Sequence, residues 1–375
     1  MNDAQHGSSV TSPSPLDALL PPEMARRAEE VGAAKVSMDR GRLVALAVLA
    51  GAFIALGGIF STVVLAGAGG APWGATRVLA GVVFSVGLVL VVVGGAELFT
   101  GNNLIVMAWA GRRVGTGAVL RNWAIVYAGN FVGGLGVALV ACGARLHESG
   151  GGAFGAAALG IAVAKLELAF EQAVALGILC NVLVCLAVWL SYSARTKTDR
   201  VLAVVPPIAA FVAAGFEHSV ANMYFVPFAL LLTHLDPGFV AAHAPDTHAL
   251  TWSRLLVRNL LPVTLGNVIG GTLLVGGTYW FVYLRPRSGI ERRPIYVLVG
   301  VVSWLVYLRC HEAENLSLAL LKVAYGVQVR LTRRRPATRL ARGEWPRRNA
   351  PEPSLRGPGA ARHRRGTCRR RPRRA

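Results

Sequence analysis

The sequence has few cysteines and few charged residues, and each of these features argues against certain classes of protein or site. Only 15% of its 375 residues are charged. Its five cysteines lack the paired spacing of a metal site, which argues against a zinc site or a disulfide framework. The sequence also shows no nucleophile–base pair and no phosphate-binding loop, so it indicates neither an enzyme nor a cofactor site.

Long uncharged runs dominate the chain instead, and 54% of its residues are hydrophobic. Six stretches are uncharged or nearly so: Leu43–Leu65, Val78–Gly111, Asn122–Ala144, Gln172–Ala194, Val201–His234 and Asn259–Leu284. A helix needs about 20 apolar residues to cross a bilayer. We therefore predict an all-α polytopic membrane protein with six spans, in which the abundant glycine allows helices to pack closely.

Two of these stretches, Val78–Gly111 and Val201–His234, are longer than one span requires. Each carries a single charged residue near its centre, Glu97 in one and Glu217 in the other. A charge at membrane depth is costly and normally faces the protein interior or a water path. We predict that the second and fifth helices are broken at the midplane, and that each carboxylate accepts hydrogen bonds from freed backbone N–H groups. A role in proton transfer is the alternative for both.

Three motifs occur twice, in the same order along the chain. The first copy has Lys35, Glu97 with Asn102, and Arg121-Asn122 ahead of Gly129-Asn130; the second has Lys165, Glu217 with Asn222, and Arg258-Asn259 ahead of Gly266-Asn267. Each copy, residues 34–143 and 164–284, contains three spans. An odd number of spans inserts the second copy upside down, so we predict two inverted repeats whose broken helices meet at the midplane.

One histidine distinguishes the second copy from the first. The segment Ala213–Met223 places His218 and Asn222 in apolar surroundings, and Leu98 takes the position of His218 in the first copy. Because Asn102 and Asn222 are common to both copies, we interpret them, with the glutamates, as support for the helix breaks. We place the chemistry at His218, since a neutral imidazole can donate one hydrogen bond and accept another. The alternative is an interior histidine that ties helices together.

Positive charge is distributed unevenly between the loops. With the N-terminus inside, the inner flanks hold eleven Lys and Arg before the C-terminal tail and the outer loops hold five. The positive-inside rule then places both ends of the chain in the cytoplasm. Residues 1–33 are expected to form a mobile cytoplasmic leader with a short surface helix near Glu23–Val31, followed by the six-span core, residues 34–286.

The chain continues beyond this core in two parts. Residues 287–330 contain an apolar segment too short for a span, which we expect at the membrane interface. Residues 331–375 carry sixteen arginines and two acidic residues and are expected to be disordered. Such a tail can bind anionic lipid; nucleic acid is a less favoured partner, and none is expected.

Three segments resemble the formate/nitrite transporter family: Val92–Gly101, Gly177–Ala187 and Ala213–Met223. The resemblance covers about residues 20–286. It implies an aquaporin-like fold without the Asn-Pro-Ala box of aquaporins, which this sequence indeed lacks. It further implies a homopentamer in the inner membrane, with a pore for small monovalent anions in each subunit.

The resemblance also implies roles for individual residues. His218 matches the pore histidine of the family, and Thr100 and Asn181 match its hydrogen-bonding neighbours. The apolar constrictions of the family correspond to Phe84, Leu88, Val184 and Phe211, and its vestibule lysines to Lys35 and Lys165.

We therefore predict transport of formate, with protons as potential co-substrates, through a pore in a lipid bilayer. Nitrite and hydrosulfide are the alternative anions. Two other hypotheses stay open: an ion channel without proton coupling, and a membrane anchor or sensor that acts through its basic tail.

Overall fold

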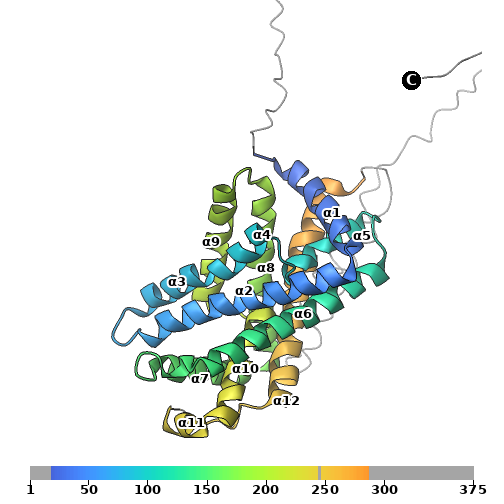
Figure 1. Cartoon of the computed structure of the whole chain (residues 1–375). Helices are drawn as coiled ribbons and strands as arrows, with labels where there is room; N and C mark the ends of the chain where they lie inside the picture. The colour runs from blue at the N-terminus through green and yellow to red at the C-terminus, as the bar shows by residue number, and fades with distance from the viewer. Residues whose placement is uncertain (1–17, 244–245, 287–375) are drawn as a thin grey trace, which may run out of the picture. The chain divides into compact units, whose positions relative to one another are not determined.

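The computed structural model describes residues 18–243 and 246–286, which form helices and no β-strand (Figure 1). The α-helices are α1 (Pro21–Ser37), α2 (Arg40–Ala66), α3 (Trp73–Phe84), α4 (Val86–Gly94), α5 (Val106–Ala110), α6 (Thr116–Gly143), α7 (Ala153–Leu166), α8 (Phe170–Ser193), α9 (Lys197–Ala213), α10 (Ser219–Leu235), α11 (Pro237–His243), α12 (Trp252–Arg254) and α13 (Leu261–Val268). Tighter 3₁₀ turns form η1 (Gly101–Ile105) and η2 (Leu146–Glu148), and wider π turns form η3 (Leu255–Leu260), η4 (Ile269–Gly277) and η5 (Trp280–Leu284). The segments predicted for 287–330 and 331–375 lie outside the described residues.

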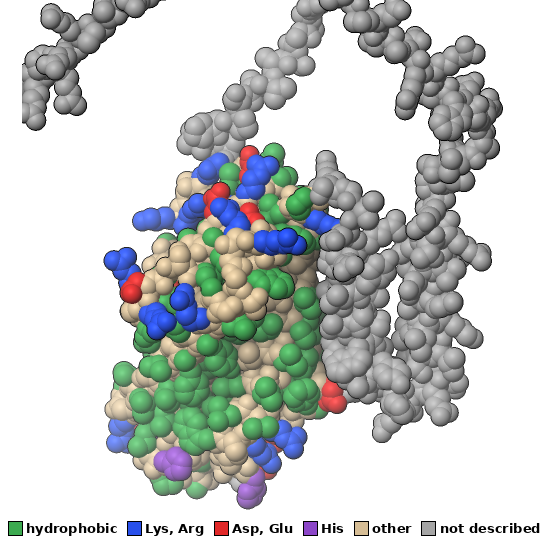
Figure 2. Space-filling model, turned by 90° about the vertical axis from the view of Figure 1, so that its right-hand side faces the viewer, with side chains coloured by type: hydrophobic (Ala, Val, Ile, Leu, Met, Phe, Trp, Pro, Cys, Tyr) green, Lys and Arg blue, Asp and Glu red, His purple; other side chains and the backbone are tan. Residues whose placement is uncertain are grey.

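The helices are long and apolar enough to form a multi-span membrane protein. Five segments meet that description: Arg40–Ala66, Trp73–Gly94, Thr116–Gly143, Phe170–Ser193 and Trp252–Leu284. A sixth candidate is α10 together with α11, a pair bent by 114°. Figure 2 shows a broad field of apolar side chains between two ends that carry Lys and Arg. The prediction of an all-α polytopic membrane protein is confirmed, with five to six spans.

The second and fifth predicted stretches are both broken near their carboxylates. Helix α4 ends at Gly94, and Gly95 follows with a φ of 80°. Helix α9 ends at Ala213, and Gly215 has a φ of 74°. A left-handed backbone is costly for residues with a Cβ, which is why glycine stands at both breaks.

The two copies of the sequence repeat also resemble each other in burial. The pattern of buried and exposed positions over residues 31–50 is repeated over 161–180, except that Val44 is exposed and Val174 is half-buried. Glycines allow the long helices of each copy to touch. A Cβ at Gly133 of α6 would collide with the Val48 carbonyl of α2, and one at Gly266 of α13 would collide with the Val174 carbonyl of α8.

Helix α1 is longer than the short surface helix expected near Glu23–Val31. It begins with two prolines, which suit a first helical turn. The Glu23 carboxylate accepts a hydrogen bond from the Leu20 N–H at 2.9 Å and so caps the helix start. Met24, Ala25 and Ala28 are buried on its inner face. Residues 21–33, which we expected in the mobile leader, thus lie in a packed helix.

Candidate functional site

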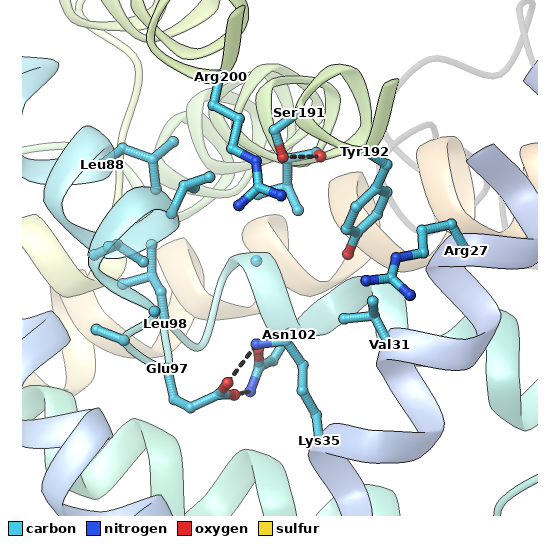
Figure 3. A pocket seen from close by; sticks show the side chains of 16 residues that line it. Arg27, Val31, Lys35, Leu88, Glu97, Leu98, Asn102, Ser191, Tyr192 and Arg200 are labelled. Carbon is cyan, nitrogen blue, oxygen red and sulfur yellow. Dashed lines mark hydrogen bonds and ion pairs between the residues drawn. The ribbon is translucent and has the colours of Figure 1, made fainter. Parts of the chain in front are cut away.

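Each helix break borders a cavity. The first, of about 220 Å³, is lined by Lys35, Gly95, Glu97 and Leu98 among others, and we call it the Lys35 cavity (Figure 3). The second, of about 80 Å³, is lined by Lys165, Gly215, Phe216 and His218 among others, and we call it the Lys165 cavity. The two have no lining residue in common. Each of the two lysines therefore lines its own cavity, together with one glycine of a helix break.

Each lysine is paired with the glutamate of its own repeat. The Lys35 Nζ donates to Glu97 Oε1 at 2.6 Å, and the Lys165 Nζ donates to Glu217 Oε1 at 2.7 Å. The glutamate side chains are only 5% exposed, against 22% for Lys35 and 16% for Lys165. The lysines were predicted to collect anions. Their charge is instead largely matched by a buried carboxylate.

The repeated asparagines extend this pair into a network. Asn102 donates to Glu97 Oε2 at 2.8 Å and to the Asn122 side-chain carbonyl at 3.0 Å. In the second copy the corresponding bonds join Asn222 to Glu217 and to Asn259, both at 2.7 Å. Asn122 and Asn259 in turn donate to the backbone carbonyls of the two lysines. The same network therefore occurs twice.

The backbone at each break is held by an asparagine that the sequence had not singled out as a site residue. We expected the glutamates to accept the freed backbone N–H groups, but the carboxylates bond to side chains. At the first break Asn130 accepts from the Phe99 N–H at 2.9 Å and donates to the Glu97 carbonyl at 3.0 Å. At the second, Asn267 accepts from the Ser219 N–H at 3.0 Å and donates to the Glu217 carbonyl at 3.0 Å. The recurring Gly-Asn pair was the signal for this role.

His218 lies at the second break, directly before α10, and is 3% exposed. Its Nδ1 accepts a hydrogen bond from the Ala221 N–H at 3.1 Å and so caps the helix. Because Nδ1 is an acceptor, the neutral ring carries its proton on Nε2. Nε2 lies 2.9 Å from the Thr100 hydroxyl, which then accepts this proton's hydrogen bond. The Thr100 hydroxyl keeps its own proton available for another acceptor.

Asn181 forms no hydrogen bond with His218. Its amide nitrogen donates to the Thr100 carbonyl at 3.3 Å, to the Asn103 side chain at 2.8 Å and to the Asn267 carbonyl at 2.7 Å. Asn181 thereby links Thr100, next to the first break, to Asn267, which binds the backbone of the second break. It positions Thr100, and Asn103 is a partner that the sequence did not indicate.

The four predicted constriction residues do not form a single group. Phe84 and Phe211 meet edge to face with ring centroids 5.7 Å apart, and both line the Lys165 cavity beside His218. Leu88, one turn after Phe84, lines the Lys35 cavity. Val184 is buried in the core and lines neither of these two cavities. Leu98 lines the Lys35 cavity, as its repeat counterpart His218 lines the other.

Comparison with known proteins agrees with this architecture. The family model described as formate/nitrite transporter matches residues 22–281. The chain belongs to the formate/nitrite transporter family. It is 43% identical over 279 residues to the formate channel FocA of Escherichia coli K12, covering 73% of this chain and 98% of that protein. It is 40% identical over 263 residues to FocA of Haemophilus influenzae, covering 69% of this chain and 93% of the relative.

Solved structures of the family resemble the chain as well. A pentameric formate channel with formate bound matches with a TM-score of 0.60 and 40% identity, over 66% of this chain and 98% of its own. An ion channel of the same family matches with a TM-score of 0.58 and 27% identity, over 70% of this chain and 99% of its own. The protein is thus a membrane transport protein for small anions, as family members are, and not an enzyme.

Proposed function

We propose that this protein conducts formate across the membrane through a pore in each subunit, with nitrite and hydrosulfide as the alternative anions. The observation that carries the proposal is the contact between His218 and Thr100, beside a cavity and between two matched helix breaks. The identity to formate channels over nearly their full length supports formate as the first candidate.

The proposed path runs from one lysine cavity to the other. An anion enters beside Lys35, passes Leu88 and leaves its water behind at the apolar side chains. It then reaches His218, together with the Thr100 hydroxyl that contacts it, and enters the Lys165 cavity, which Phe84 and Phe211 also line. Shedding water from a bare charge costs several kcal/mol or more, so the middle of the path must supply compensation.

Hydrogen-bond donors at the centre supply that compensation in our proposal. The Nε2–H of His218 donates to the Thr100 hydroxyl, which in turn donates its own proton in a hydrogen bond to the anion. A second proton on the ring would have to sit on Nδ1, where it would replace the bond from the Ala221 N–H. This geometry favours a neutral His218 that donates a hydrogen bond, over one that carries a mobile proton.

Protons remain part of the proposal as a co-substrate. An anion that takes up a proton at the cavity mouth crosses the apolar section as the neutral acid, without the cost of stripping a charge of its water. An ion channel without proton coupling is the other mechanism. A pH gradient separates them, because only coupled flux responds to the proton gradient at fixed membrane potential.

The assembly and membrane placement are proposed with the pore. We propose a homopentamer, because the formate channel whose structure matches at 40% identity is pentameric. We place it in the inner membrane with both termini in the cytoplasm, on the strength of the unequal loop charges. In this arrangement the repeats are inverted and the Lys35 cavity faces the cytoplasm.

The test is formate flux by purified protein in liposomes, with and without a pH gradient. His218→Ala removes the central donor, and we expect flux to fall at least tenfold. His234→Ala is the matched control, because His234 is exposed near the other end of α10. Equal flux in wild type and His218→Ala would remove the histidine from the mechanism. A wild-type pore that passes neither formate nor nitrite would refute the proposed function itself.

A further inference from the structure

The charged side chains that line the Lys35 cavity have a net positive charge. Four charged side chains line it: the cations Arg27, Lys35 and Arg200, and the carboxylate Glu97. Lys35 and Glu97 form a pair at 2.6 Å and neutralise each other. The excess positive charge of the cavity therefore comes from two arginines that are not among the residues of the proposed path.

Both guanidinium groups are available to a ligand. The Arg200 side chain forms no hydrogen bond or ion pair with any residue that the structure describes. Arg27 has a loose ion pair with Glu30 at 3.7 Å, in which the side chains are 56% and 55% exposed. Such exposed pairs contribute little and are readily exchanged for another partner.

The nearest acidic neighbour of Arg200 in sequence, Asp199, is occupied elsewhere. Its carboxylate caps α9 by accepting from the Thr196 N–H at 2.9 Å. This backbone bond also lowers the pKa of Asp199. It therefore leaves the Arg200 guanidinium without a carboxylate of its own.

A hydroxyl donor accompanies the two arginines. In Figure 3 the side chains of Arg200, Tyr192 and Arg27 reach toward the same space, from α9, α8 and α1 respectively. The Tyr192 hydroxyl has no hydrogen-bond partner within residues 18–243 and 246–286. Two guanidinium groups and a phenol supply planar pairs of N–H donors and one O–H donor, which suit the oxygens of a tetrahedral anion.

The Lys165 cavity offers no such arrangement. It contains one arginine, Arg77, whose Nη2 donates to the Val212 carbonyl at 2.8 Å and whose Nε donates to the Ala213 carbonyl at 3.2 Å. These bonds hold the guanidinium at the end of α9. Of the two cavities, only the Lys35 cavity thus has uncommitted positive charge in excess.

We infer that Arg27, Arg200 and Tyr192 form a binding site for a soluble, doubly charged tetrahedral oxyanion, such as inorganic phosphate, sulfate or a phosphate monoester. Leu88 and Leu98, each 2% exposed, line the same cavity. A doubly charged anion loses far more hydration free energy at such apolar side chains than a singly charged one, so it does not pass. It binds at the mouth and obstructs access of the singly charged substrate to the path. The expected effect on formate flux rests on the proposed function, whereas the binding of the oxyanion does not.

Calorimetric titration of the detergent-purified full chain with sulfate tests the site, with chloride at equal ionic strength as the reference for screening. We expect saturable sulfate binding, weakened at least tenfold by Arg27→Gln and by Arg200→Gln. The matched controls are Arg26→Gln and Lys197→Gln. They remove one cation each from α1 and α9, outside the cavity lining, and should change the affinity less than twofold.

Formate flux in liposomes gives the second measurement. Sulfate should slow wild-type flux more than chloride at equal ionic strength does, and Arg200→Gln should remove the difference. The inference is overturned if wild type binds no sulfate, or if Arg26→Gln weakens binding as much as Arg27→Gln. Saturable sulfate binding by a protein that does not conduct formate would refute the proposed function and leave the oxyanion site standing.

Discussion

At the scale of single residues, the structure gives His218 a role that its position in the sequence left open. The sequence allowed either ring nitrogen to donate. In the structure Nδ1 is used to cap α10, and this fixes Nε2 as the donor toward Thr100. In the proposed mechanism, the hydroxyl of Thr100 is then the group that donates a hydrogen bond to a passing anion. Removal of this hydroxyl should therefore reduce formate flux as strongly as removal of the His218 imidazole.

Thr100→Val keeps the shape of the side chain and deletes the hydroxyl. The anion would lose a hydrogen bond to a charged group, which is worth about 1.5–3 kcal/mol and corresponds to roughly a 10- to 150-fold loss. We expect formate flux in liposomes to fall within that range. Thr100→Ser retains the hydroxyl and should stay within about threefold of wild type. If valine and serine behave alike, the hydroxyl takes no part in conduction.

At the scale of elements, the helix breaks are stabilised mainly by two asparagines. Asn130 and Asn267 each make three hydrogen bonds to backbone groups around a break. Both are fully buried. Backbone groups at the two breaks lack hydrogen-bond partners within a helix, and the asparagines supply these partners. An unpaired backbone group at membrane depth would be costly.

Asn130→Ala and Asn267→Ala should destabilise the protein to a similar extent. Each variant loses three hydrogen bonds, at about 1 kcal/mol apiece, and leaves buried backbone groups unpaired. A fall of several degrees in the temperature of thermal unfolding in detergent is the expected result for both. A large effect at one position and none at the other would show that the two breaks are not equivalent.

Glycines set how closely the long helices approach each other. A Cβ at Gly133 would overlap the Val48 carbonyl of α2, whereas a Cβ built at Gly136 on the same helix has no atom within 4 Å apart from its own stretch of helix. Gly133→Ala should therefore lower the temperature of thermal unfolding. Gly136→Ala should leave it unchanged or raise it, because alanine is favoured in a helix by about 1 kcal/mol. Equal effects would mean that α2 and α6 are not in close contact.

At the scale of the whole molecule, the sequence predicted the architecture better than the chemistry of individual contacts. Long apolar runs and repeated motifs are local patterns, and they were sufficient for the all-α membrane fold and the two broken helices. The inversion of the repeats stays a prediction. Asn130 recurs in the repeat as Asn267, but which backbone groups they bind depends on helix packing.

Contacts between distant segments could not be predicted from the sequence. Arg27 and Arg200 are far apart in the chain and lie in ordinary polar flanks, so only the fold brings them to one cavity. The vestibule role predicted for the two lysines stays a prediction, although each lines a cavity of its own. Each lysine and its glutamate are separated by 62 or 52 positions, and no local pattern specifies their pairing.

Deletion of residues 287–375 separates the pore hypothesis from the anchor or sensor hypothesis. The family match ends at residue 281, and the helices described by the structure end with η5 at Leu284. The lysine networks, both helix breaks and His218 all lie before that point. If the pore is the functional unit, the truncated protein should conduct formate in liposomes at the wild-type rate per molecule. An anchor or sensor that acts through its arginine-rich tail would instead show no formate flux even at full length, and truncation would abolish its cellular phenotype.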